Sequence, residues 1–82
     1  MAITKEEICQ WLTRGIETKA THVIVVADTF DYEYYPVMVS ESEDINELIK
    51  EYDGVNMQRI MEIYNLHMDI EKQLNERRSY NI

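Results

Sequence analysis

An unbroken apolar run from His22 to Ala27 is the feature that most constrains how this chain of 82 residues can fold. Its residues are mostly β-branched, and no polar residue alternates with them. A half-buried strand shows such alternation, whereas a strand covered on both faces does not. The run therefore predicts a strand that is central in its sheet or buried against a second copy of the chain.

A second strand is expected directly after this run. The residues from Asp28 to Asp31 favour a turn, and the segment from Tyr34 to Val39 predicts the returning strand. Pro36 has no N–H group to give to a sheet ladder, so this second strand should lie at an edge or contain a bulge.

Three helices are predicted around these strands. The first begins at a capping box, in which the side chains of Thr4 and Glu7 each bind a free backbone N–H group, and it fades near Lys19. The other two are short and begin after the Ser40–Asp44 loop and at Asp69. Their inward-facing residues are predicted to be Ile8, Leu12 and Ile16, then Ile45, Leu48, Ile49 and Tyr52, then Ile70 and Leu74.

The segment from Met57 to Leu66 fits either a helix or a third strand. We favour the strand, because Gly54 and Asn65 bound a run of strand length. The element order is then α-β-β-α-β-α. This order predicts one α+β domain over residues 1–82, with a three-stranded, mainly antiparallel sheet and helices packed on it. A chain this short buries only about 60–65% of its unfolded surface, so we also expect a homo-oligomer that enlarges the core.

The net charge of −8 is concentrated in the middle of the chain. The segment 28–53 holds nine acidic residues and a single lysine, and it accounts for the whole net charge. Such a segment repels nucleic acids and anionic membranes and favours a basic partner. An alternative explanation is that these acids provide solubility and helix caps, and after Ser40 this explanation is favoured.

Several classes of chemistry find no support in the sequence. Gly15 and Gly54 are the only glycines, which excludes phosphate-binding glycine loops. Cys9 is the only cysteine, so an internal disulfide is excluded and a reducing cytoplasm is expected. No apolar run reaches the roughly 20 residues of a membrane span. We therefore expect a protein that is not an enzyme, with no catalytic residues, metal or cofactor.

The most distinctive motif is the aromatic and acidic turn that follows the central strand. Rigid aromatic side chains interleaved with acids are typical of recognition surfaces. By strand alternation Tyr32 and Tyr34 share a face and Tyr35 points the other way. The alternative, that these rings only complete a small core, is equally open. The candidate binding residues of this turn are Asp28, Thr29, Phe30, Asp31, Tyr32, Glu33 and Tyr34.

A second candidate group opens the third predicted strand. Asn56, Gln58 and Arg59 could read a base edge and hold a phosphate. We favour the alternative, in which Asn56 is a turn residue and Arg59 pairs with the acidic turn.

Three stretches together resemble small uncharacterised proteins of bacteriophages and prophages. They are Thr21 to Val37, which contains the signature DTFDYEYYPV, Asn56 to Tyr64, and Glu71 to Arg77. The resemblance spans nearly the whole chain and implies a phage or mobile-element origin. It brings no established catalytic residue with it. Small phage proteins of this kind are often directed at host machinery, including defence systems.

Two hypotheses follow for the function. The preferred one is a phage protein in the cytoplasm of the bacterial host, which inhibits a host protein through an acidic, tyrosine-rich surface. The alternative is an oligomeric sponge that sequesters a cyclic-nucleotide or ADP-ribose-type immune signal. In the alternative a ring of the turn would stack on the base and Arg59 would meet the phosphate.

Overall fold

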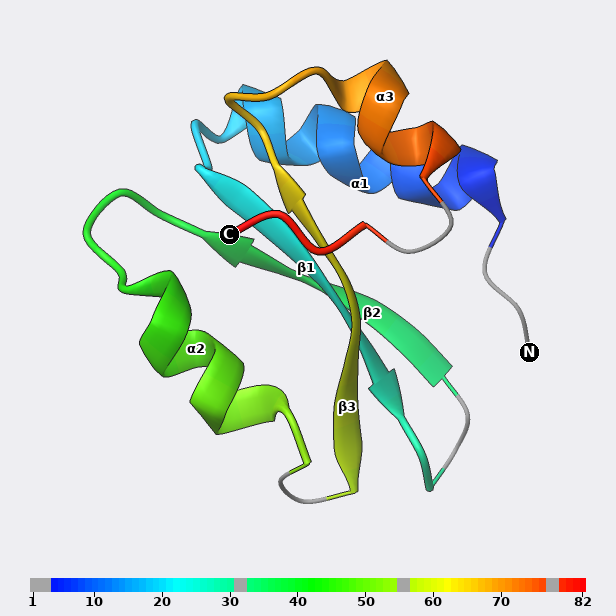
Figure 1. The fold of residues 1–82 in the computed structure, drawn as a ribbon, viewed down its shortest axis with the longest axis vertical. Helices are drawn as coiled ribbons and strands as arrows, with labels where there is room; N and C mark the ends of the chain where they lie inside the picture. Colours follow the sequence, from blue (N-terminus) through cyan, green and yellow to red (C-terminus); the bar gives the residue numbers. More distant parts are fainter. Residues whose placement is uncertain (1–3, 31–32, 55–56, 77–78) are drawn as a thin grey trace.

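The computed structural model describes residues 4–30, 33–54, 57–76 and 79–82. The predicted α+β class and the order α-β-β-α-β-α are confirmed, and the ambiguous segment after Met57 is a strand (Figure 1). The elements are α1 (Lys5–Glu17), β1 (His22–Asp28), β2 (Glu33–Val39), α2 (Ile45–Tyr52), β3 (Gln58–Asn65) and α3 (Ile70–Asn75).

The sheet has the order β2-β1-β3, and β1 pairs antiparallel with both neighbours. The apolar run therefore forms the central strand, and every residue from Val23 to Ala27 is buried. Pro36 lies on the edge strand β2, as its missing N–H group requires. A register shift next to Val25 and Val26 marks a bulge in the pairing with β3.

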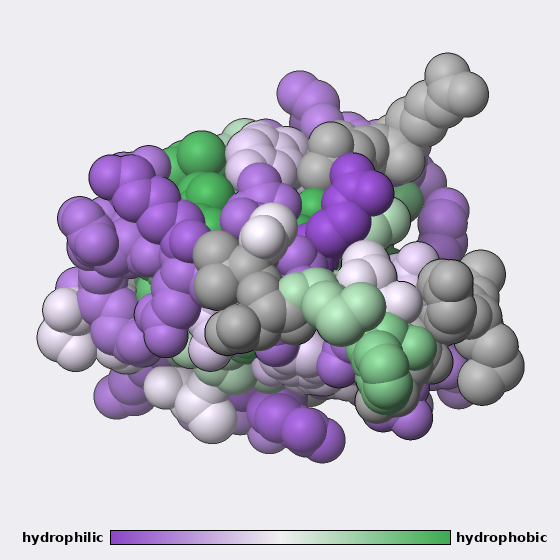
Figure 2. Space-filling view, turned by 90° about the horizontal axis from the view of Figure 1, so that it is seen from below, coloured by the Kyte–Doolittle hydropathy of each residue, from purple (hydrophilic) through white to green (hydrophobic). Residues whose placement is uncertain are grey.

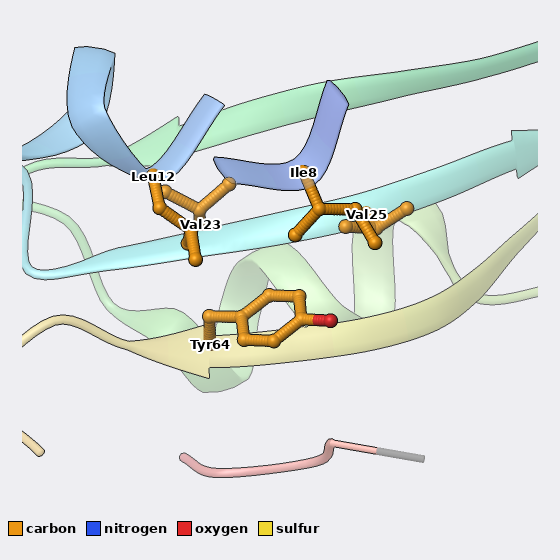
Figure 3. Close-up of a cluster of buried hydrophobic side chains, with 5 residues drawn as sticks. All are labelled: Ile8, Leu12, Val23, Val25 and Tyr64. Carbon is orange, nitrogen blue, oxygen red and sulfur yellow. The ribbon is translucent and has the colours of Figure 1, made fainter. Parts of the chain in front are cut away.

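Helices cover both faces of β1, with α1 and α3 on one side of the sheet and α2 on the other (Figure 1). Val23 and Val25 point to the first side, where they pack with Ile8 and Leu12 of α1 and with Tyr64 of β3 (Figure 3). Ile24 and Val26 point to the second side and pack beneath Ile45, Leu48, Ile49 and Tyr52 of α2. This alternation explains why the run carries no polar residue.

The predicted inward stripe of α1 is wrong at one position. Ile8 and Leu12 are buried, but Ile16 is 52% exposed. Gly15 occupies the third inward position instead, and a Cβ atom there would lie 2.8 Å from Val23 Cγ2 and 3.0 Å from Leu66 Cδ1. The helix approaches the sheet so closely at this turn that only glycine fits, and Ile16 is turned outward.

The Thr4 half of the predicted capping box is present, and the other two helices also begin at capped residues. The Glu7 N–H donates to Thr4 Oγ1 at 3.2 Å, Asn46 N–H donates to Asp44 at 2.9 Å, and Lys72 N–H donates to Asp69 at 3.2 Å. Each cap gives a partner to a backbone donor that the first turn leaves free.

The far edge of β3 is closed by the C-terminal residues, which the sequence did not predict to be structured. Ile63 N–H donates to Ser79 O at 2.8 Å, and Asn81 N–H donates to Ile63 O at 3.0 Å. This parallel bridge extends the sheet beyond β3. Ser79 is completely buried beneath it.

Gln73 of α3 holds this arrangement together, and its side chain is only 1% exposed. Its Oε1 accepts from Asn65 N–H at 2.8 Å and from Asn81 Nδ2 at 3.1 Å. Its Nε2 donates to the carbonyl oxygens of Asn65 at 2.9 Å and Asp69 at 3.1 Å. A single buried amide thus joins the end of β3, the start of α3 and the C-terminal residues.

Replacing Gln73 by methionine keeps the volume and removes all four hydrogen bonds. Because the partner groups become unpaired in a buried site, we expect Gln73→Met to lower the free energy of unfolding by about 2–3 kcal/mol in urea titrations. Lys72→Met is the matched control on the exposed face of the same helix, and its effect should stay within about 0.5 kcal/mol. Equal stability of the two variants would contradict this assignment.

Candidate binding site at the hairpin end of the sheet

The two groups of candidate residues come together at one end of the sheet. We call it the hairpin end: the turn between β1 and β2 together with the start of β3. Asp28 pairs with both Glu33 and Gln58 across the sheet, and Ala27 pairs with Arg59. Candidate residues that are about 30 positions apart in the sequence are therefore neighbours in space. Three of the candidates, namely Asp31, Tyr32 and Asn56, lie outside the described residues.

Thr29 ties the two parts of the hairpin end to each other. Its N–H group donates to Met57 O at 2.7 Å, and its hydroxyl donates to the same oxygen at 2.5 Å. Met57 itself has a φ of 63°. This is a left-handed backbone conformation that residues other than glycine and asparagine rarely adopt. The two Thr29 hydrogen bonds hold Met57 in this conformation.

Phe30 and Met57 present their side chains to solvent from these adjoining segments. Phe30 is 71% exposed and Met57 is 58% exposed, which makes them the most exposed large apolar residues of the described chain. The Phe30 N–H donates to Asp28 Oδ1 at 2.8 Å, so the backbone that carries the ring is also fixed. Figure 2 looks onto this end of the molecule and shows apolar surface beside hydrophilic side chains. We name Phe30 and Met57 the apolar anchor.

The described tyrosines of the turn are less exposed than the anchor. Tyr34 and Tyr35 point to opposite faces, as strand alternation requires, and both are half-buried against the two core clusters. The Tyr35 hydroxyl accepts a hydrogen bond from the Gln58 amide, and burial raises the pKa of Tyr35. The two hypotheses for the aromatic motif therefore each describe part of it. Phe30 faces outward, and these tyrosines support the core.

Arg59 is exposed. The favoured prediction that it pairs with the acidic turn stays a prediction, because Asp31 of that turn lies outside the described residues. Gln58 is half-buried and its amide is engaged by Tyr35, so it presents less of its polar group to a ligand than the sequence suggested. Met57 was not among the candidates, because its exposure depends on a backbone conformation that methionine rarely adopts.

The acidic segment divides into two parts with different roles. In the loop before α2, Glu43 Oε1 accepts from Ser40 N–H at 3.1 Å and from the Ser40 hydroxyl at 3.0 Å. Asp44 caps α2. These contacts agree with the structural explanation for the acids after Ser40. At the hairpin end Glu33 is exposed, and Asp53, the exposed C-cap of α2, accepts from Ile60 N–H of β3 at 3.3 Å through its Oδ1.

A hollow of about 320 Å³ lies at the opposite end of the sheet, where β1 begins and β3 ends. Its described lining contains Lys19, Glu41 and His67 but no Phe, Tyr or Trp ring, so it offers no stacking surface of the kind that nucleotide bases use. No three His, Cys, Asp or Glu side chains of the described ranges are placed to hold a metal ion. Within the same ranges, no helix has the length and apolarity needed to cross a membrane.

His22 is a half-buried titratable residue that follows Thr21, one of the residues lining this hollow. Its Nδ1 contacts Thr21 Oγ1 at 2.9 Å, and its Nε2 is buried with no hydrogen-bond partner in the described part of the chain. Burial, and to a lesser degree the nearby His67, lower the pKa of His22.

A lowered pKa in the folded state makes stability depend on pH. Below the ordinary histidine pKa of about 6.5 the unfolded chain binds a proton that the folded chain resists, so stability is present above that pH and is lost as pH falls. We expect His22→Asn to lose less unfolding free energy than the unchanged protein between pH 7 and pH 5. His67→Asn is the control at an exposed position and should change the slope less. Identical slopes for His22→Asn and the unchanged protein would contradict the assignment.

Comparison with family models, curated proteins and solved structures finds no match for this chain. The resemblance to phage and prophage proteins therefore stays a prediction from the sequence.

Proposed function

We propose that this chain is a non-enzymatic phage or mobile-element protein that binds and inhibits a host protein, with the apolar anchor as its contact surface. The observation that carries the proposal is the display of Phe30 and Met57, at 71% and 58% exposure, on two segments that Thr29 binds together. Large apolar side chains displayed in this way are typical of binding anchors.

The fixed backbone of the anchor favours tight binding. A flexible loop loses conformational entropy when it docks, and each ordered side chain adds to that loss. Here the Phe30 backbone is held by Asp28 and the Met57 backbone is held by Thr29, so much of this ordering is complete before a partner arrives. The left-handed backbone at Met57 costs on the order of 1 kcal/mol, which the surrounding hydrogen bonds offset.

Charge at the hairpin end favours a basic partner. Glu33 is exposed at the hairpin end, and the chain as a whole carries a net charge of −8. Long-range attraction of this kind accelerates association and weakens as salt is added. The surface we propose is thus an apolar anchor with an acidic surround, rather than one built on Tyr34 and Tyr35.

A sponge for a nucleotide-derived signal is the second candidate, and one observation favours it. The exposed Phe30 ring and the exposed Arg59 lie at the same end of the sheet, so a base and a phosphate could be held together there. The net charge of −8 disfavours a small anionic ligand. We therefore rank protein binding first.

Quantitative capture from a bacterial lysate tests the anchor. Immobilised protein should retain a host protein that the double variant Phe30→Ala, Met57→Ala loses, because the variant removes the apolar contacts and leaves the fold intact. Met68→Ala is the matched control, since Met68 is 48% exposed and lies outside the hairpin end, in the connection from β3 to α3. Retention should also fall in high salt. Equal retention by the double variant would reject the anchor as the contact surface.

Thermal-shift measurements with cyclic nucleotides and cyclic ADP-ribose isomers separate the two candidates. A ligand at 100 times its Kd stabilises the protein by about 2.7 kcal/mol, which raises the Tm of a domain this small by roughly 10–20 °C. We expect no shift. A shift of this size that Arg59→Ala abolishes, and that Arg14→Ala on the exposed face of α1 leaves unchanged, would instead establish the sponge.

A further inference from the structure

The connection from α2 to β3 is fixed to the start of β3 by two hydrogen bonds. Gly54 N–H donates to Gln58 O at 2.8 Å. The Asp53 side chain accepts from Ile60 N–H at 3.3 Å through its Oδ1. Asp53 also donates its own N–H to Ile49 O at 2.9 Å, so it joins α2 through its backbone and β3 through its side chain. Figure 1 shows the end of α2 and the start of β3 at the same end of the molecule as the turn between β1 and β2.

These two bonds meet β3 from the side opposite to Thr29, which binds Met57 O from the end of β1. Backbone groups of successive strand residues point to alternate sides, so the bonded groups of Gln58 and Ile60 face away from β1. The segment that carries Met57 is therefore held from both sides. Its backbone is left-handed twice, with a φ of 78° at Gly54 and of 63° at Met57. Glycine adopts this conformation freely, whereas methionine rarely does, so the bonds on both sides are needed to keep it.

Helix α2, which supplies the outer bonds, packs less deeply than the other two helices. Both α1 and α3 contain buried residues, whereas all eight residues of α2 are described and none of them is buried. Its contacts with the sheet come from the half-buried side chains of Ile45, Leu48, Ile49 and Tyr52. Elements with few buried apolar contacts open at a lower free energy than the core does. The helix that holds the start of β3 is thus the one whose docking is most readily loosened.

We propose that Asp53 is a positioning residue for the apolar anchor, and that the docking of α2 on the sheet controls the presentation of Met57 through it. While α2 is docked, Asp53 and Gly54 hold the start of β3, and the Met57 carbonyl stays aligned with Thr29. When α2 loosens, the outer bonds are lost and the unfavourable Met57 backbone relaxes. This inference rests on the proposed function, because it concerns the regulation of the same contact surface.

The carboxylate of Asp53 has a second effect that must be separated from positioning. Asp53 is exposed, and an exposed negative charge attracts a basic partner whether or not it binds β3. Asp53→Asn removes the charge and keeps an oxygen that accepts from Ile60 N–H, whereas Asp53→Ala removes both. A positioning role predicts that asparagine preserves what alanine loses.

Amide hydrogen exchange of the full chain, measured by NMR without any partner, tests the positioning role. Rates are compared with that of Val25 at the buried centre of β1, whose exchange reports opening of the whole sheet. Asp53→Ala should speed exchange at Gly54 and Thr29 about tenfold relative to Val25, because loss of the bond to β3 loosens the segment on both sides. Asp53→Asn should keep both rates within about threefold of those in the unchanged protein.

Loosening α2 at a distance from Asp53 tests the control by docking. Leu48→Ala removes apolar contacts in the middle of α2 and should speed exchange at Thr29 in the same way. Leu74→Ala is the matched control, because Leu74 is also half-buried but packs from α3 on the opposite face of the sheet. In the Asp53→Ala background Leu48→Ala should add little, since the connection through which it acts is already broken.

Capture from the bacterial lysate links positioning to binding. Asp53→Asn should retain about as much host protein as the unchanged chain, and Asp53→Ala should retain several-fold less. Thr29 exchange that Asp53→Ala leaves unchanged, equal effects of alanine and asparagine at this position, or a full effect of Leu48→Ala in the Asp53→Ala background would each overturn the proposal. The exchange measurements need no partner, so a lysate from which nothing is captured would reject the proposed function while exchange still decides the positioning role.

Discussion

Burial of β1 on both of its faces is the constraint on which the rest of the structure depends. Val23, Ile24 and Val26 are completely inaccessible to solvent, and they face opposite sides of the sheet. A strand of this kind gains its full hydrophobic stabilisation only when strands flank it and helices cover it above and below. In this chain of 82 residues the requirement uses every other helix and strand: β2 and β3 at its sides, α1 and α3 on one face and α2 on the other.

Residues of the hairpin end that take little part in the core are exposed, and in the proposed function they form the contact surface. The loops at the hairpin end extend past the covered part of β1, so Phe30 and Met57 contribute little to the core. Their backbones are nevertheless fixed, because Asp28 and Thr29 at the end of β1 supply the hydrogen bonds that hold them. A rigid scaffold that positions exposed loop residues is a common arrangement for binding proteins. Among the described residues no strand lies beside the outer edge of β2, whereas β3 is completed by the C-terminal residues.

The sequence predicted what depends on local pattern and missed what depends on contacts between distant residues. The β-branched run, the cap at Thr4 and the edge position of Pro36 each follow from a few adjacent residues, and the structure agrees with them. Helical periodicity placed Ile16 inward, but the close approach of α1 to Val23 and Leu66 at Gly15 reverses that position. The helical repeat of apolar residues in a sequence carries no information about how closely the helix approaches the sheet.

The candidate site shows the same division. The turn from Asp28 to Tyr34 and the group from Asn56 to Arg59 were recognised separately, and only the pairing of β1 with β3 brings them together. Alternation placed Tyr34 and Tyr35 on opposite faces but could not tell how deeply the helices bury each ring. Met57 and the buried amide of Gln73 gave no sequence signal, since their roles depend on partners that lie far away along the chain.

Hydrogen exchange at Thr29, combined with NOE contacts between Thr29 and the Met57 backbone, tests the central claim most directly, that the hairpin end is held in place before any partner binds. The account predicts a Thr29 amide protected to nearly the same degree as the amides of β1, because it donates to Met57 O at 2.7 Å. It also predicts NOEs between the Thr29 protons and backbone protons of the segment that begins at Met57. A Thr29 amide that exchanges as fast as in an unstructured peptide, with no such NOE, would contradict it.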